Sequence, residues 1–139
     1  MSAHHCQFRI YYEDTDAGGI VYHARYLGFA ERARAEALRS LGINIGDMEV
    51  QDGVGFVVRQ IGVRYHTPLR LDERMNVETV LHHAAGARLK LRQVITNLSR
   101  DGQVAAVIDV ELACLNPDSL VPMRLPTFYQ ERLAGLKEK

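Results

Sequence analysis

The stretch YYEDTDAGGIVYHARY, residues Tyr11–Tyr26, decides how this chain folds and what it does. It follows a short apolar run and places acidic residues, ending with Asp16, in front of the pair Gly18-Gly19. Aspartate and glycine favour a turn, because an Asp side chain bonds nearby N–H groups and Gly adopts positive φ angles. The pattern predicts a bend that holds Asp16 between a strand and a helix.

A long helix is expected directly after this bend, over His23–Leu41, with Gly42 as its stop. Ala30, Ala33 and Ala37 recur at steps of three and four residues, so one face is apolar and small. These alanines predict that a sheet packs very close to the helix. The first N–H groups of any helix lack partners inside it and favour an anion or a developing oxyanion.

The remainder of the chain reads mainly as β-structure. A strand is expected at Cys6–Tyr12, and an irregular link at Ile43–Gly53 precedes four further β-rich runs. The pair Asp101-Gly102 predicts a tight hairpin, which makes the last two runs antiparallel neighbours. A short helix is expected at Thr127–Leu136. The four later runs are Gly55–His66, Arg74–His83, Arg88–Ser99 and Gln103–Asn116.

Length, composition and charge limit the classes of protein. The 139 residues, 47% of them hydrophobic, predict a single domain over 1–139. Lys plus Arg and Asp plus Glu both number 17, so general electrostatic attraction to nucleic acid or an anionic membrane is not expected. With only Cys6 and Cys114 and no apolar run long enough to span a bilayer, the chain is expected in the reducing cytoplasm.

These elements together predict an α+β fold in which a curved antiparallel sheet wraps around one long helix. Their order and the segment EDTDAGGIVYHARY resemble the hotdog-fold thioesterases of the 4-hydroxybenzoyl-CoA thioesterase type. With Phe56-Val57-Val58-Arg59 included, the chain is most similar to bacterial acyl-CoA thioesterases associated with the Tol-Pal system. The resemblance covers nearly the whole chain and implies hydrolysis of an acyl-CoA thioester to a carboxylic acid and free CoA.

The resemblance also implies roles for particular residues. Asp16 matches the family's catalytic carboxylate, which acts as nucleophile or general base. His23 matches the position whose backbone N–H polarises the thioester carbonyl, and its imidazole is expected near that carbonyl. A thioester is an activated acyl group, so neither a metal nor a cofactor is expected. The substrate-binding residues that we expect are Gly19, Tyr22, Tyr26, Val58 and Arg59.

Assembly is implied by the resemblance as well. The family joins two sheets edge to edge and builds each site from both chains, so a homodimer or homotetramer is expected. In such an assembly, strand residues Gly55–Tyr65 of a partner line the pocket. Acyl-CoA is the expected substrate, and acyl carrier protein is a second carrier that the sequence leaves open.

Several residues have simpler interpretations. Asp14 is expected to shape the turn or the helix entry rather than to react. Glu31 is a second candidate for the base, with pairing to Arg34 as its more ordinary role. A metal site at His4–Cys6 is not favoured, because these residues sit at a chain end and partly in a strand.

The phosphates of CoA need positive groups, and the sequence does not decide which ones supply them. The turn HHAAGA, residues 82–87, lacks the basic residues that some relatives place before the next strand. Alternate basic residues in that strand share one face, which also fits an ordinary solvated surface. The candidates are Arg59, Arg64, Arg88, Lys90 and Arg92.

Three other functions fit parts of the sequence. A noncatalytic module that binds acyl-CoA or acyl carrier protein would use the same pocket without turnover. The segment DTDAG resembles the D-x-D-G-T signature of haloacid-dehalogenase-type phosphatases, but that chemistry requires a parallel sheet with alternating helices. A dehydratase on the hotdog fold is the third, with a less well matched arrangement of histidine and helix carboxylate.

Overall fold

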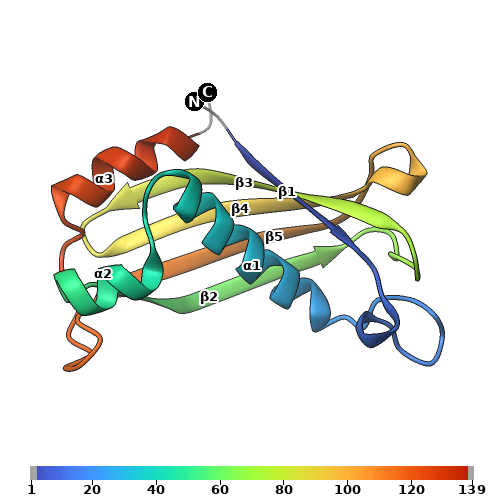
Figure 1. The fold of residues 1–139 in the computed structure, drawn as a ribbon, viewed down its shortest axis with the longest axis horizontal. Helices are drawn as coiled ribbons and strands as arrows, with labels where there is room; N and C mark the ends of the chain where they lie inside the picture. The colour runs from blue at the N-terminus through green and yellow to red at the C-terminus, as the bar shows by residue number, and fades with distance from the viewer. Residues whose placement is uncertain (1–2, 138–139) are drawn as a thin grey trace.

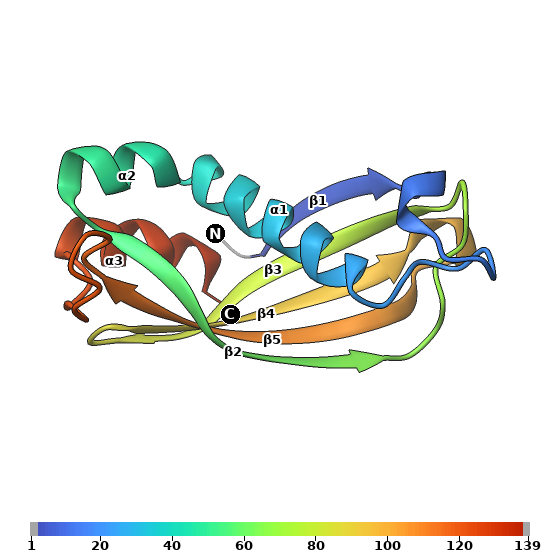
Figure 2. The ribbon, with the colours of Figure 1, turned by 90° about the horizontal axis from the view of Figure 1, so that it is seen from below.

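The computed structural model describes residues 3–137 as one five-stranded antiparallel sheet with three α-helices on one of its faces (Figures 1 and 2). The strands lie in the order β1-β3-β4-β5-β2, so β1 and β2 form the two edges. All neighbouring strands are antiparallel, which confirms the predicted fold class and contradicts the parallel sheet that the phosphatase reading requires. The strands are β1 (His4–Arg9), β2 (Gly55–Tyr65), β3 (Arg74–Ala85), β4 (Arg88–Asn97) and β5 (Gln103–Leu115).

Helix α1 (Arg25–Ser40) lies diagonally across the concave face of the sheet (Figures 1 and 2). The side chains of Ala30, Ala33 and Ala37 are all at most 1% exposed, which confirms the close packing predicted from the alanines. Small side chains let the helix backbone approach the strands, because no long side chain separates them.

A buried polar cluster fixes α1 on the sheet. The Gln93 amide in β4 donates to the Ala30 carbonyl of α1 at 2.9 Å and to the Thr79 hydroxyl of β3 at 3.0 Å. The Arg34 guanidinium in turn donates to the side-chain amide oxygen of Gln93 at 3.0 Å. Gln93 and Thr79 are fully buried, so these bonds satisfy groups that water cannot reach.

The hairpin between β4 and β5 forms as predicted. Asp101 and Gly102 have φ angles of 56° and 74°, the left-handed conformation that a tight turn requires. The register runs from Asn97 opposite Gln103 to Arg88 opposite Ala113.

The predicted strand and helix boundaries beside the acidic turn were wrong by a few residues. The strand ends at Arg9, because the Asp14 carboxylate accepts the Tyr11 N–H at 2.9 Å and bends the chain into a 3-10 turn over Tyr12–Asp14. The helix begins at Arg25 instead of His23.

Helix α2 (Ile45–Asp52) occupies most of the predicted irregular link, so that prediction was also wrong. The Asn44 side chain caps its start by accepting the Asp47 N–H at 3.1 Å, and Gly53 ends it with a φ angle of 63°. Met48 alone among the helix residues is buried, so the helix shows almost no apolar period in the sequence.

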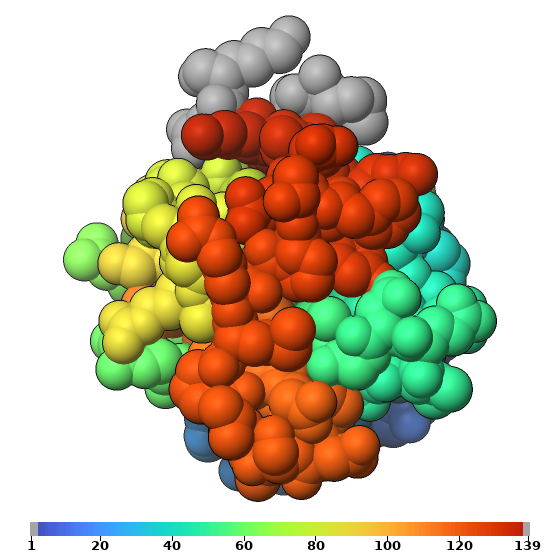
Figure 3. Space-filling model, turned by 90° about the vertical axis from the view of Figure 1, so that its left-hand side faces the viewer, coloured from blue at the N-terminus to red at the C-terminus, as the bar shows by residue number. Residues whose placement is uncertain are grey.

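Helix α3 (Thr127–Leu133) continues into a 3-10 turn over Ala134–Leu136, which together match the predicted terminal helix. The Tyr129 hydroxyl donates to the Asp52 carboxylate and ties α3 to α2. Burial, with the Asp52 bond and charge, raises the pKa of Tyr129 to about 12. Figure 3 shows α3, α2 and the segment between β5 and α3 closing the end of the molecule away from the acidic turn. Within residues 3–137, no helix is both long and apolar enough to cross a membrane.

Candidate active site

Asp14 holds the acidic turn against the start of α1. Its side chain is 3% exposed, and its Oδ2 accepts the Tyr11 N–H. The Arg25 guanidinium, on the first residue of α1, donates to Asp14 Oδ1, with Nε at 3.1 Å. The structure thus confirms that Asp14 shapes the turn and the helix entry.

Asp16 lies on the bend with its side chain exposed. Its N–H donates to the Ile20 carbonyl at 2.9 Å, and its Oδ1 accepts the Gly18 N–H at 2.8 Å. A Cβ on Gly18 would lie 3.3 Å from this oxygen, so the bond requires the close approach that glycine allows. Among the residues that the structure describes, Asp16 Oδ2 has no hydrogen-bond donor. One carboxylate oxygen is therefore fixed, and the other is open to a substrate or water.

His23 lies in a turn just before α1, with its imidazole exposed and its ring 4.5 Å from the Tyr22 ring. The peptide that joins them is fixed, since the Tyr22 carbonyl accepts the Arg25 N–H at 2.8 Å. No acceptor for the His23 N–H is present in the described part of the chain. The residue before the helix, Ala24, supplies no side-chain cap to the first N–H groups of α1.

A groove of about 370 Å³ opens beside His23. Asp16 is not one of the lining residues, but its N–H donates to the carbonyl of Ile20, which is. The groove is mostly apolar, as expected for an acyl or pantetheine site, with the His23 and His66 imidazoles among its polar groups. It is lined by Ile20, Val21, His23, Tyr26, Tyr65, His66, Thr67 and Pro68.

The segment Tyr65–Pro68 was not predicted to line the groove of its own chain, although Tyr65 was expected to reach the pocket of a partner. Tyr65 is the last residue of β2 and the other three follow it, so only the folded sheet brings this segment to the turn. Tyr65 donates its hydroxyl to the His23 carbonyl at 2.7 Å and meets the Tyr26 ring edge-on at 5.1 Å. Burial raises the pKa of Tyr26, whose hydroxyl accepts the Leu69 N–H at 3.3 Å. In the sequence, nothing about Tyr65 and the His-Thr-Pro that follows it indicates that these residues line a groove beside the acidic turn.

The structure brings together some of the predicted substrate-binding residues and separates others. Gly19 and Tyr22 belong to the acidic turn, and Tyr26 lines the groove. Val58 and Arg59 lie elsewhere on β2, on the order of 20 Å along the strand from the groove. A single chain therefore does not assemble all five predicted contacts.

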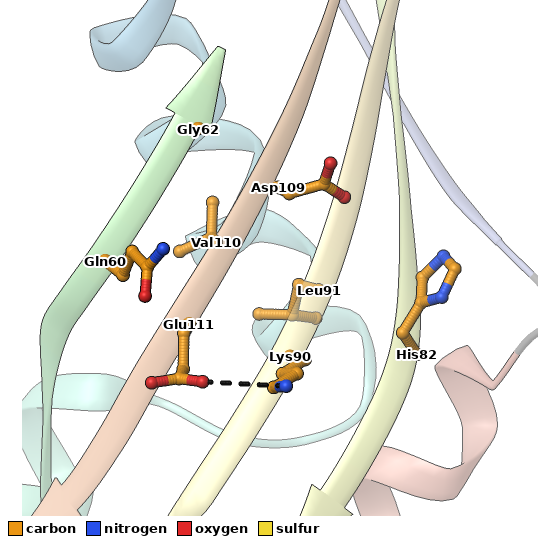
Figure 4. Close-up of a pocket in the computed structure, with 8 residues that line it drawn as sticks. All are labelled: Gln60, Gly62, His82, Lys90, Leu91, Asp109, Val110 and Glu111. Atoms are coloured by element: carbon orange, nitrogen blue, oxygen red, sulfur yellow. Dashed lines mark ion pairs between the residues drawn. The ribbon is translucent and has the colours of Figure 1, made fainter.

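One candidate phosphate-binding residue, Lys90, lines a depression of about 310 Å³ on the sheet face away from α1 (Figure 4). Several of the candidate cations already have acidic partners. Lys90 lies 3.8 Å from Glu111, which also pairs with Arg59, and Arg92 pairs with Asp109 at 2.9 Å. The Arg59 hydrogen bond, more than any other contact, holds the pKa of Glu111 below its usual range. No one of these cations stands out as a phosphate ligand.

The remaining candidates do not form a second site. Arg34 donates to Gln93, while Glu31 stays exposed on α1 and acts on Arg34 through its charge. Burial, the larger effect, lowers the pKa of Arg34. No group of three or more His, Cys, Asp or Glu side chains within 3–137 is arranged to hold a metal ion, and this includes His4–Cys6.

Comparison with known proteins gives one consistent result. The family description "Thioesterase-like superfamily" matches residues 11–133. The acyl-CoA thioesterase YbgC of Haemophilus influenzae is 38% identical over 129 residues, which are 93% of either chain. A probable thioesterase from Bartonella henselae superposes with a TM-score of 0.83 at 35% identity, covering 90% of this chain and all of that one. A 4-hydroxybenzoyl-CoA thioesterase, at 18% identity over 96% of this chain and 99% of its own, shares the fold with a TM-score of 0.89.

Proposed function

The chain belongs to the thioesterase-like superfamily, and we propose that it hydrolyses acyl-CoA thioesters to a carboxylic acid and free CoA. One observation carries the proposal. The turn Asp14–Tyr26 holds an open carboxylate oxygen of Asp16 and an uncovered N–H of His23, and His23 lines an apolar groove. The relatives named as acyl-CoA thioesterases support the choice of substrate class.

Asp16 supplies the base or the nucleophile. As a base, its Oδ2 takes a proton from water while the water oxygen adds to the thioester carbonyl carbon. As a nucleophile, Oδ2 adds to that carbon itself, and water then hydrolyses the resulting anhydride. In both routes the C–S bond breaks and CoA leaves as a thiolate that takes up a proton.

His23 acts on the carbonyl oxygen. Its backbone N–H donates to the oxygen as negative charge develops there, a contact worth about 3 kcal/mol in comparable sites. The exposed imidazole stands beside this amide and serves carbonyl orientation or proton transfer. Gly19, Tyr22 and Tyr26 contact the substrate from the same chain.

A second copy of the chain completes the site. The outer edge of β2 has no neighbouring strand among the described residues, and the Val58 side chain on it is 48% exposed. When two such edges pair antiparallel about a two-fold axis, the Val58-Arg59 end of one strand lies beside the Tyr65 end of the other. Val58 and Arg59 of one chain then reach the groove of its partner. A homodimer is the smallest such assembly, and a homotetramer contains two of them.

The alternative is a module that binds acyl-CoA or acyl carrier protein without hydrolysis. The two functions differ in thiol release, which is measured with short, long and aromatic acyl-CoA thioesters and with acyl carrier protein carrying the same groups. Turnover that saturates with one of these series supports the hydrolase and ranks its substrates. Saturable binding with no thiol release supports the module. The cytoplasmic location and the link to the Tol-Pal system stay predictions from the resemblance.

A further inference from the structure

The carbonyl group of His23 is held by a residue from a distant part of the chain. It accepts the Tyr65 hydroxyl at 2.7 Å, between the end of β2 and the start of α1. The helix does not supply this partner, because the Leu27 N–H is bonded to the Ala24 carbonyl instead. Tyr65 therefore supplies the hydrogen bond that the His23 carbonyl does not receive from the helix.

Two contacts orient Tyr65, although the residue is 50% exposed. Its backbone pairs with Ala106 of β5, so the sheet fixes where the side chain begins. Its ring stands at 85° to the ring of Tyr26, which is 3% exposed and bonded to the Leu69 N–H. An edge-to-face contact of this kind stabilises one orientation of the ring. The hydroxyl is thus presented to His23 from two fixed elements.

The two peptide groups that flank the His23 α-carbon each carry hydrogen bonds. On one side, the Tyr22 N–H donates to the Asp14 carbonyl at 2.9 Å and the Tyr22 carbonyl accepts the Arg25 N–H. On the other side, Tyr65 holds the carbonyl of His23. A donor aimed at an oxyanion contributes to rate only if it is held in place before the reaction, because a small misplacement weakens the developing bond.

We propose that Tyr65 is a positioning residue for thioester hydrolysis: its hydroxyl holds the His23 carbonyl and so orients the His23 N–H toward the thioester oxygen. This inference rests on the proposed function. Because the Tyr65 hydroxyl acts through His23, its loss is expected to lower the rate of the chemical step more than it weakens substrate binding.

The test is Tyr65→Phe, which keeps the ring and its contact with Tyr26 and removes the hydroxyl alone. Tyr129→Phe is the matched control, because it removes a phenolic hydrogen bond, to Asp52, at the other end of the molecule. We expect Tyr65→Phe to lower kcat about tenfold with KM within about twofold of wild type, and Tyr129→Phe to leave both unchanged. Circular dichroism at the assay temperature establishes that both variants are folded.

A second readout does not depend on activity. The Ala24 N–H shares its peptide group with the His23 carbonyl, so losing the Tyr65 bond is expected to shift the Ala24 amide resonance in Tyr65→Phe and not in Tyr129→Phe. Three results overturn the inference: wild-type kcat in Tyr65→Phe, a rise in KM alone, or equal losses of kcat in both variants. Absence of thiol release from the wild type would instead contradict the proposed function, and the amide shift would still report whether Tyr65 orders the turn.

Discussion

At the scale of single residues, the two aspartates of the turn have different environments and different roles. Asp14 is buried and bonded through both oxygens, whereas Asp16 is exposed and keeps one oxygen open. The same residue type thus builds the turn at one position and is available for chemistry at the other.

Replacing Asp14 tests the structural role. Asp14→Asn removes the charge that Arg25 pairs with, and Arg25 is 39% exposed, so water recovers part of the lost interaction. We expect the free energy of unfolding to fall by about 1–3 kcal/mol, below the range for a fully buried pair. Urea denaturation measures this change. Glu36→Gln breaks the exposed pair with Arg39 and serves as the control, with a change within about 0.5 kcal/mol. Equal effects in the two variants would contradict a special role for Asp14.

The residues of the turn could be predicted from the sequence, but the rest of the groove could not. Asp16 and His23 were predicted as site residues because their spacing is local and resembles a known family. Tyr65 and His66 reach the same groove through the pairing of β2 with β5, and that pairing leaves no local pattern at either residue. The acidic partners of the CoA-phosphate candidates could not be predicted either, because they are neighbours on adjacent strands, as Glu111 is for Arg59 and Lys90.

At the scale of elements, the prediction succeeded where an apolar period was long and failed where tertiary contacts set a boundary. The alanines of α1 and the Asp101-Gly102 hairpin gave clear signals, and both features form. Helix α2 was missed because it buries Met48 alone and therefore shows no apolar period in the sequence. The start signal at Asn44 and the stop signal at Gly53 were not enough to predict it. The strand β1 ended early because the Asp14 carboxylate captured a backbone N–H.

The attachment of α1 to the sheet depends on the buried Gln93 amide. Gln93→Leu substitutes an apolar side chain of similar size and leaves the Thr79 hydroxyl and the Arg34 guanidinium without this partner. We expect the free energy of unfolding to drop by about 2 kcal/mol, because a buried polar group without a partner costs more than a satisfied one contributes. Thermal and urea unfolding measure it. Gln103→Leu, at an exposed position on β5, is the control. An unchanged stability in Gln93→Leu would show that the cluster does not hold the helix.

At the scale of the whole molecule, the proposed site includes contacts that a second copy of the chain would supply. The predicted contacts Val58 and Arg59 lie far from the groove of their own chain, and the edge of β2 is the surface that can bring them to another. An edge strand with unpaired backbone groups readily pairs with a second strand.

The assembly is tested by its mass. We expect light scattering to give two or four times the 15.7 kDa of one chain. Val58→Asp places a carboxylate at the proposed junction, so it should favour the monomer and reduce thiol release at the same time. Val50→Asp, at an 86% exposed position on α2, should change neither. A wild-type monomer with full activity would contradict the shared site.

The proposed hydrolysis depends above all on the Asp16 carboxylate. Asp16→Asn is the sharpest change, because asparagine retains an oxygen that accepts the Gly18 N–H and so preserves the turn, while the negative charge is lost. Asp118→Asn, at an exposed position after β5, is the matched control. Thiol release from the best acyl-CoA substrate should fall at least about 100-fold in kcat for Asp16→Asn and stay at the wild-type rate for Asp118→Asn. A folded Asp16→Asn protein that releases thiol at the wild-type rate would contradict the account.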